Sequence, residues 1–159
     1  MEAESIRFDP VRRRQRGLLQ AYERAVRQLD LAARNVRVLA RAGVFLTRGT
    51  RPVPDPLTAA VTTLASAVRD LGTDLAALPL APQRDGEFPG TASHVVRTAL
   101  DAVRLAAGAL EETHDVPVVM IVGQVRATAV DLMLGSGLPR QQVLAAADEA
   151  LFEQDTLGA

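Results

Sequence analysis

Apolar residues recur at alternating spacings of three and four through the first third of the chain, the pattern of a long amphipathic helix. Asp9 and Pro10 suit the N-cap and the first helical position, and Gly49 with the "RPVP" sequence that follows indicates an end near residue 48. The positions expected to face inward form one heptad seam: Leu19, Tyr22, Val26, Leu29, Ala33, Val36, Ala40 and Gly43.

Four further helices are expected at about 55–78, 92–114, 116–134 and 139–152. The first of these four has the most regular apolar spacing, with Leu57, Val61, Leu64, Val68, Leu71, Leu75 and Leu78 all expected to face inward. Residues 79–91 contain three prolines and two glycines and are expected to form a loop.

The helix at 116–134 is apolar nearly all round, which is typical of a central helix, and no segment makes a convincing strand. The pattern therefore predicts an all-α, antiparallel bundle of four to five helices with a long first helix. We expect a single domain at 9–153, a flexible tail at 1–8 and a frayed tail at 154–159.

The long first helix also carries a second apolar stripe, outside the expected seam. Leu31, Val38 and Phe45 are seven residues apart and fall nearly opposite the seam. A four-helix arrangement covers only one side of this helix, so either the fifth helix or a second protein surface is expected to cover the stripe. Arginines beside an exposed apolar stripe are common at interfaces. The candidate interface residues are Leu31, Val38, Phe45, Arg27, Arg34 and Arg41.

The composition of the chain excludes several classes of function but does not identify one. The 159 residues contain no cysteine, which excludes thiol catalysis, zinc–thiolate sites and disulfides. Residues 1–51 hold 12 arginines against 5 acidic residues, a net charge of +7, and residues 52–159 hold 6 against 14, a net charge of −8. Tryptophan and lysine are absent, which makes a nucleic-acid partner a poor expectation. Packing of the basic first helix on the acidic remainder would explain the asymmetry without any partner.

The densest cationic run lies at the start of the first helix. Arg12, Arg13, Arg14 and Arg16 form it, and they are candidates for contact with anionic lipid headgroups. The alternative is a solvated helix start with no binding role. The most apolar run, at 116–125, is short for a membrane span, and the polar N-terminus does not read as a signal peptide.

Motifs for catalysis are weak throughout. No G-x-S-x-G or phosphate-binding glycine pattern is present. Glu111 and His114 have the Glu-x-x-His spacing of di-iron bundles, but the second such pair is missing. We therefore expect no catalytic residue, no metal and no cofactor, and no enzymatic activity.

Polar residues within the apolar helices are the remaining candidates for a site. They are Asn35, Arg37, Gln124, Arg126 and Asp131. They either line a small polar pocket or make hydrogen bonds between helices or ion pairs between chains, and the second interpretation is favoured.

Three stretches of the chain carry a family resemblance: "LDLAARNVRVLARAG" at 29–43, "PVPDPLTAAVTTLASAVRDL" at 52–71 and "VGQVRATAVDLMLGSGLPRQQVLAAADEAL" at 122–151. Together they resemble the C-terminal cytoplasmic part of actinobacterial membrane proteins of the fusaric acid resistance and aromatic acid exporter family. The resemblance spans most of residues 12–153 and is a pattern of helical sequence without a catalytic fingerprint.

The resemblance implies a non-catalytic cytoplasmic domain that serves assembly or regulation of an exporter at the inner face of the cell membrane. Its partners would be other copies of the chain or a transmembrane region of the same protein, and the arginines at 12–16 would lie near the inner leaflet. The alternative is a helical bundle that senses a small molecule in an internal pocket lined by the fourth helix.

Overall fold

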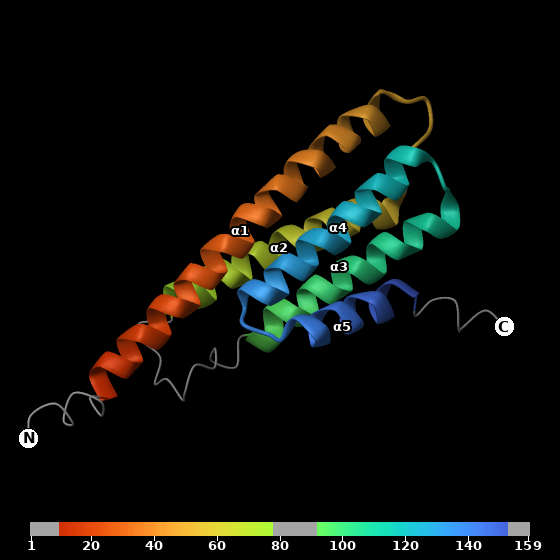
Figure 1. Cartoon of the computed structure of the whole chain (residues 1–159). Helices are drawn as coiled ribbons and strands as arrows, with labels where there is room; N and C mark the ends of the chain where they lie inside the picture. Colours follow the sequence, from red (N-terminus) through yellow and green to blue (C-terminus); the bar gives the residue numbers. More distant parts are fainter. Residues whose placement is uncertain (1–9, 78–91, 153–159) are drawn as a thin grey trace, which may run out of the picture.

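The computed structural model of the chain describes residues 10–77 and 92–152, and it is entirely helical outside the short connections. Five helices follow one another: α1 (Pro10–Arg48), α2 (Asp55–Ala77), α3 (Ala92–Glu112), α4 (Val116–Gly135) and α5 (Arg140–Phe152). The described residues contain no strand. Figure 1 shows α1 as the longest rod, along one edge of the molecule. The predicted all-α bundle with a long first helix is confirmed.

The helix ends agree with the sequence signals within about two residues. α4 follows Asp115 and has Pro117 in its first turn, and the backbone N–H of Ser136 closes its last turn on Leu132 O at 3.0 Å. Gly137, with φ of 99°, takes the left-handed conformation just beyond, where glycine is favoured. The "GSG" at 135–137 is therefore a helix stop. The expected loop at 79–91 and the tails at 1–8 and 154–159 lie outside the described residues.

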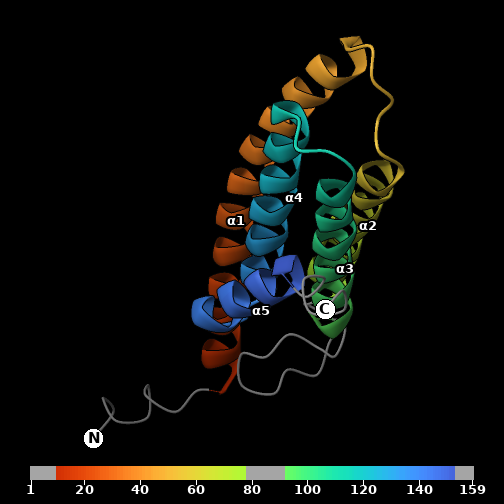
Figure 2. The same ribbon diagram turned by 90° about the vertical axis from the view of Figure 1, so that its right-hand side faces the viewer.

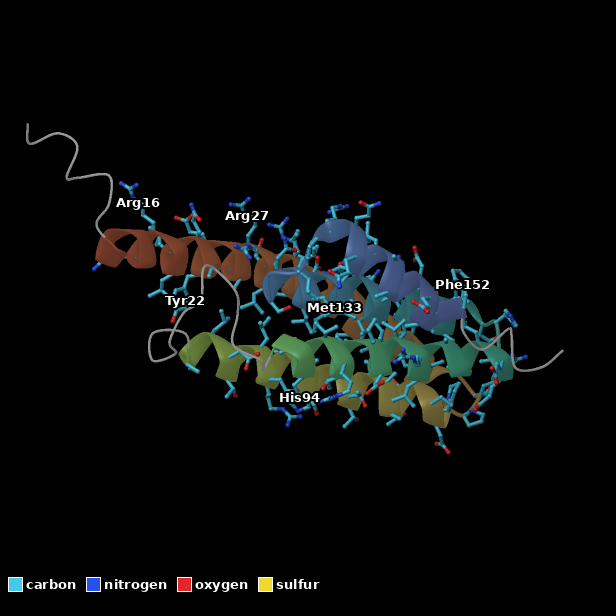
Figure 3. All side chains as sticks on the ribbon, turned by 90° about the horizontal axis from the view of Figure 1, so that it is seen from below. Arg16, Tyr22, Arg27, His94, Met133 and Phe152 are labelled. Carbon is cyan, nitrogen blue, oxygen red and sulfur yellow. The ribbon has the colours of Figure 1, made fainter. Side chains whose placement is uncertain are left out.

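α4 is the central helix, as its all-round apolar sequence predicts. It packs against α1, α2, α3 and α5, whereas α2 packs mainly on α3. Leu132 and Met133 of α4 meet Leu71, Val95 and Val103 in the core, and all five side chains are fully buried. Met133 lies between the α1–α4 and α2–α3 layers (Figure 3).

α1 lies antiparallel to α4 and packs extensively on that helix alone (Figures 1 and 2). The contact is made by small side chains, because Ala25, Ala32 and Ala42 of α1 are buried and a Cβ on Gly135 of α4 would lie 3.5 Å from the Cβ of Gln28. Small residues on both sides let the two backbones approach closely.

The prediction of which face of α1 is buried is wrong. Leu19 and Val26 are 59% and 63% exposed, Val36 is 43% exposed, and Ala33 and Ala40 are also exposed. The helix is rotated so that the neighbouring row of Ala25, Ala32 and Leu39 faces α4. The physical reason is the alanine row: it allows a closer approach to α4 than the bulkier seam would.

The seam of α2 is likewise only half covered. Leu57, Leu64 and Leu71 are buried, as expected, but Val61 and Val68 are 36% and 39% exposed. On the wheel of α2 these two valines lie on the flank away from Asp70, whose carboxylate accepts a hydrogen bond from Thr98 of α3. Val61 lines a hollow together with residues of α1, so the incompletely covered flanks of α1 and α2 border the same opening.

Candidate interaction surface on α1

The predicted second stripe lies on the outside of the bundle. Phe45 is 69% exposed and Leu31 is 40% exposed, while Val38 is half-buried. α5 packs across α3 and α4 and not over this stripe. Among the described residues, the fifth helix therefore does not cover the stripe.

The arginines beside the stripe form a solvent-facing ridge. Arg27, Arg34 and Arg41 are all exposed, and Arg16 and Arg27 point away from the bundle in Figure 3. Arg34 Nη2 lies 2.7 Å from Asp30 Oδ2 of the same helix, a well-solvated pair that adds little stability. Among the described residues, Arg27 and Arg41 meet no acidic side chain of another helix. The positive charge of Arg27 and Arg41 is therefore not neutralised by packing on the acidic part of the chain.

The cationic run at the helix start is only partly described. Arg16 is exposed. The side chains of Arg12, Arg13 and Arg14 lie outside the described residues, so the headgroup contact stays a prediction.

A second apolar flank of α1, not recognised as exposed from the sequence, borders the side of this helix that faces α2. We call it the open row: Leu19, Val26, Ala33, Val36 and Ala40. Between this row and α2 the bundle is bridged at one end, where Tyr22 Oη donates a hydrogen bond to Leu75 O at 2.8 Å. The sequence does contain a signal for this row. Apolar residues occur on several faces of the first helix, and one neighbouring helix cannot cover them all.

The opening between α1 and α2 contains a small hollow of about 260 Å³. Leu39, Gly43 and Leu46 of α1 line it with Val61 of α2, and Ile121 of α4 contributes to the lining. The hydroxyls of Thr47 and Thr62 in its wall donate to backbone carbonyls of their own helices. The hollow is therefore apolar and slightly smaller than most ligand pockets.

Two of the polar candidates meet inside the α1–α4 contact. Asn35 Nδ2 donates to Asp131 Oδ2 at 2.8 Å, and Asp131 is buried. Burial raises the pKa of the Asp131 carboxyl above its ordinary value of 3.8, while the Asn35 hydrogen bond and the Arg140 charge act to lower it. The pair is an interhelical hydrogen bond, which is the favoured interpretation.

The other polar candidates do not join this pair. Arg126 forms an ion pair with Asp148 of α5, and Arg37 is exposed on α1. Gln124 lies on the same stripe of α4 as Asp131, and its buried Oε1 has no hydrogen-bond partner among the described residues. The five candidates are thus dispersed over two helix contacts and one open face, and they do not form one pocket.

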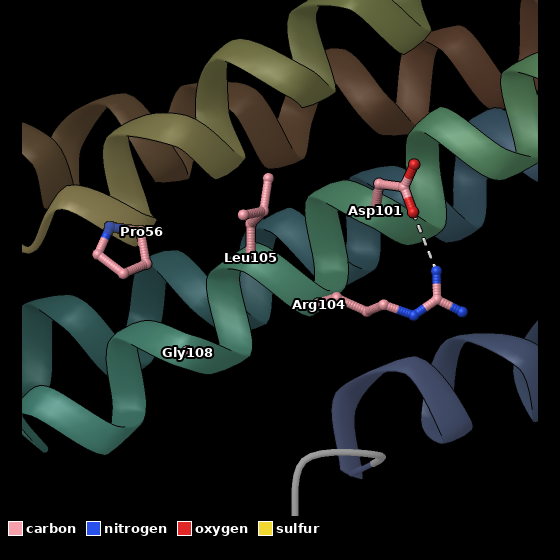
Figure 4. A pocket seen from close by; sticks show the side chains of 5 residues that line it. All are labelled: Pro56, Asp101, Arg104, Leu105 and Gly108. Carbon is pink, nitrogen blue, oxygen red and sulfur yellow. Dashed lines mark hydrogen bonds and ion pairs between the residues drawn. The ribbon is translucent and has the colours of Figure 1, made fainter.

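The described residues include a further hollow and no arrangement typical of a metal site. Figure 4 shows a shallow hollow of about 440 Å³ between the start of α2 and α3, where Arg104 Nη1 lies 3.0 Å from Asp101 Oδ1. Asp101 and Arg104 are the only charged residues among the described ones that line it, and their charges offset one another. Across the described ranges, no three His, Asp or Glu side chains are placed to hold a metal ion. α3 ends at Glu112, two residues before the expected end at 114, so His114 lies beyond the helix and does not share a helix face with Glu111.

The apolar run at 116–125 extends into the 20-residue helix α4. Of the described helices, α4 alone is long and apolar enough to cross a membrane by length and composition, and 56% of its most apolar stretch is buried inside the bundle. A core helix of a soluble protein has the same properties.

Fold and surface together define a class: an all-α helical bundle whose longest helix is covered on one side only by the other described helices. Comparisons with protein-family models, with curated proteins and with solved structures find no match for the chain. The resemblance to exporter domains therefore depends on the quoted sequence stretches alone.

Proposed function

We propose that the chain is a non-catalytic module that binds another protein surface through α1 and thereby serves assembly or regulation of a membrane exporter at the inner face of the membrane. The observation that carries the proposal is the exposure of α1. Within the described residues, this helix presents six large apolar side chains to solvent: Leu19, Val26, Leu31, Val36, Val44 and Phe45. They lie in rows on two flanks of the helix, and extended exposed apolar surface rimmed by polar residues marks interaction sites in proteins.

The charge on α1 supports a docking role. Apolar side chains flank the arginine ridge on both sides, and arginine is enriched at interfaces, where its stem covers apolar surface and its head makes hydrogen bonds. The exporter setting and the choice of aromatic carboxylates as transported compounds come from the family resemblance.

Deletion and complementation in the native host test this proposal. Cells without the chain are expected to accumulate an added aromatic carboxylate such as fusaric acid, and the wild-type chain is expected to restore the low level. The double variant Leu31→Glu/Phe45→Glu should fold, because both side chains are exposed, but should fail to restore it, because two carboxylates would be desolvated in the docked state.

The matched control is Ala145→Glu, which adds a carboxylate on the exposed side of α5. It is expected to complement like the wild type. Unchanged accumulation after deletion, or full complementation by the double variant, would contradict the proposal.

A second candidate function is small-molecule sensing, and the hollow between α1 and α2 is the observation that favours it. A ligand that fills the hollow would bridge α1 to α2 and should raise the melting temperature. Val61→Trp, which adds a large side chain at a partly exposed residue lining the hollow, is expected to abolish the shift given by any aromatic acid that binds. A panel of such acids that leaves the wild-type melting temperature unchanged would dismiss this function.

A further inference from the structure

We propose that α1 pairs in antiparallel orientation with α1 of a second copy of the chain, through the open row. The inference depends on the proposed function in one respect, that α1 is an interaction surface, and it specifies the partner. Leu31 and Phe45 lie on the other flank of the arginine ridge, so this pairing leaves them free for a different contact.

The first observation is that the open row belongs to a heptad seam. Leu19, Val26, Ala33 and Ala40 occupy one position of the heptad, and Tyr22, Leu29, Val36 and Gly43 occupy the position three residues later. Four consecutive heptads of this kind are the sequence pattern of a helix that packs against another helix. In the structure the first set is exposed and the second is half-buried, apart from the exposed Val36. The seam is formed, but the described helices supply no partner for its outer row.

The second observation is the charge beside the seam. The flanking positions on the solvent side are Arg16, Glu23, Asp30 and Arg37, which carry both signs. A surface of mixed sign can complement itself when two copies meet. A partner of uniformly basic or acidic character would meet two like charges here.

The orientation follows from what flanks the other side of the seam. The flank on the other side of the seam consists of Ala25, Ala32 and Leu39. In a parallel pair, the charged flank of each helix would face this apolar flank of the partner. These residues are apolar, the two alanines are buried, and the whole row faces α4. In an antiparallel pair, the charged flank of one helix faces the charged flank of the other, so the antiparallel arrangement alone pairs the charges.

Charge matching also selects a register. When the two-fold axis lies between Ala33 and Val36, Asp30 of each copy faces Arg37 of the partner subunit, and no like charges from this flank face each other. The layers then pair Ala33 with Val36, Ala40 with Leu29 and Gly43 with Val26, one small residue with one larger residue each time. About 28 residues of each helix overlap, a contact roughly 42 Å long at 1.5 Å per residue.

Light scattering with paired variants tests the interface. At about 100 μM the wild-type chain is expected at twice the mass of one chain, and Val26→Glu/Val36→Glu at the mass of one. The control Leu31→Glu/Phe45→Glu changes equally exposed residues on the other flank and is expected to remain dimeric. Circular dichroism of each variant checks that the helical content is retained.

A charge exchange tests the register. Asp30→Arg and Arg37→Asp should each raise the dimer dissociation constant about tenfold, and the double exchange should bring it back to within about threefold of the wild type. Because Asp30 also pairs with Arg34 of its own helix, Arg34→Gln serves as the control and should leave the constant within about threefold of the wild-type value.

Introduced cysteines test the orientation, because the chain has none of its own. Ala33→Cys is expected to form a disulfide between copies under mild oxidation, since the two positions are about 4.5 Å apart along the axis in this register. Ala40→Cys is expected to stay reduced, because its copies would be roughly 16 Å apart along the axis. Efficient cross-linking at both positions would indicate a parallel pair and overturn the orientation.

A monomeric wild-type chain at every concentration, or a dimer that survives Val26→Glu/Val36→Glu, would overturn the inference. Neither result affects the proposed function, which is tested in cells by the variant of the other flank. Conversely, a dimer that behaves as expected, together with full complementation by Leu31→Glu/Phe45→Glu, would keep this inference and remove the proposed docking through the Leu31 and Phe45 flank.

Discussion

Asp131 is the residue whose protonation is most closely tied to the packing of α1. Its carboxyl is buried in the α1–α4 contact, where desolvation raises its pKa above 3.8. Between 3.8 and the raised pKa, the folded chain holds a proton on this group that the unfolded chain has released. The ionised carboxylate therefore lowers stability above the raised pKa, and acidification through that pKa removes this penalty.

We expect Asp131→Asn to be more stable than the wild type at neutral pH, because the amide oxygen still accepts the Asn35 hydrogen bond without a buried charge. The advantage should shrink as the pH falls through the raised pKa toward 3.8. Urea unfolding of both proteins between pH 4 and pH 8 measures it. Asn35→Ala should act in the opposite direction, since it removes a donor that lowers the pKa, and should cost about 1.5–3 kcal/mol at neutral pH. A stability difference that is constant with pH would contradict the assignment.

The sequence pattern identified polar side chains that make contacts between helices, but it did not show which of them contact each other. Gln124, Thr128 and Asp131 form a narrow polar stripe that the spacing on the fourth helix reveals, and one of them does bond to α1. Asn35 and Asp131 are 96 positions apart, and their meeting depends on the rotation of α1. No local pattern carries that information, so Arg37 and Arg126 could not be separated from the true pair.

At the scale of elements, the rotation of α1 is the main departure from expectation. Helix ends were predictable, because N-cap, proline and glycine signals act within a few residues of each end. The buried face was not, because α1 has apolar residues at its seam, beside the seam and opposite it. The choice among these faces was made by α4, whose Gly135 permits the alanine row to approach.

Neighbouring alanines distinguish the two orientations of α1. Ala32 is 4% exposed against α4, whereas Ala33 belongs to the open row and would be the buried one in the expected seam. We expect Ala32→Leu to lower the free energy of unfolding by about 1–3 kcal/mol, because the close helix contact has no room for it. Ala33→Leu should change it by less than about 0.5 kcal/mol. Urea unfolding at low protein concentration measures both, and the reverse order would restore the orientation expected from the seam.

At the scale of the molecule, the architecture followed from one property of the sequence. A helix that is apolar nearly all round must be surrounded, and α4 is, by the four other helices. What the sequence could not show is how completely the first helix would be covered. That depends on the slight contact between α1 and α2, which leaves two half-covered rows facing one opening.

Association through the open row of α1 couples folding to protein concentration. If α1 pairs with a second copy, the dimer is favoured over unfolded chains by mass action, and the melting temperature should rise with protein concentration. Calorimetry between about 5 and 500 μM is expected to show a rise of several degrees for the wild type. Val26→Glu/Val36→Glu should show none, and an equal rise for the variant would point to association through another surface.

Tyr22 makes the opening visible to optical methods. It is the only tyrosine of the chain, tryptophan is absent, and its hydroxyl bridges α1 to the carbonyl of Leu75. The intrinsic fluorescence of the protein therefore comes almost wholly from the point where the two helices are tied together. Without an attached dye, its emission and anisotropy can therefore report when this hydrogen bond breaks or when a ligand or a second chain binds beside it.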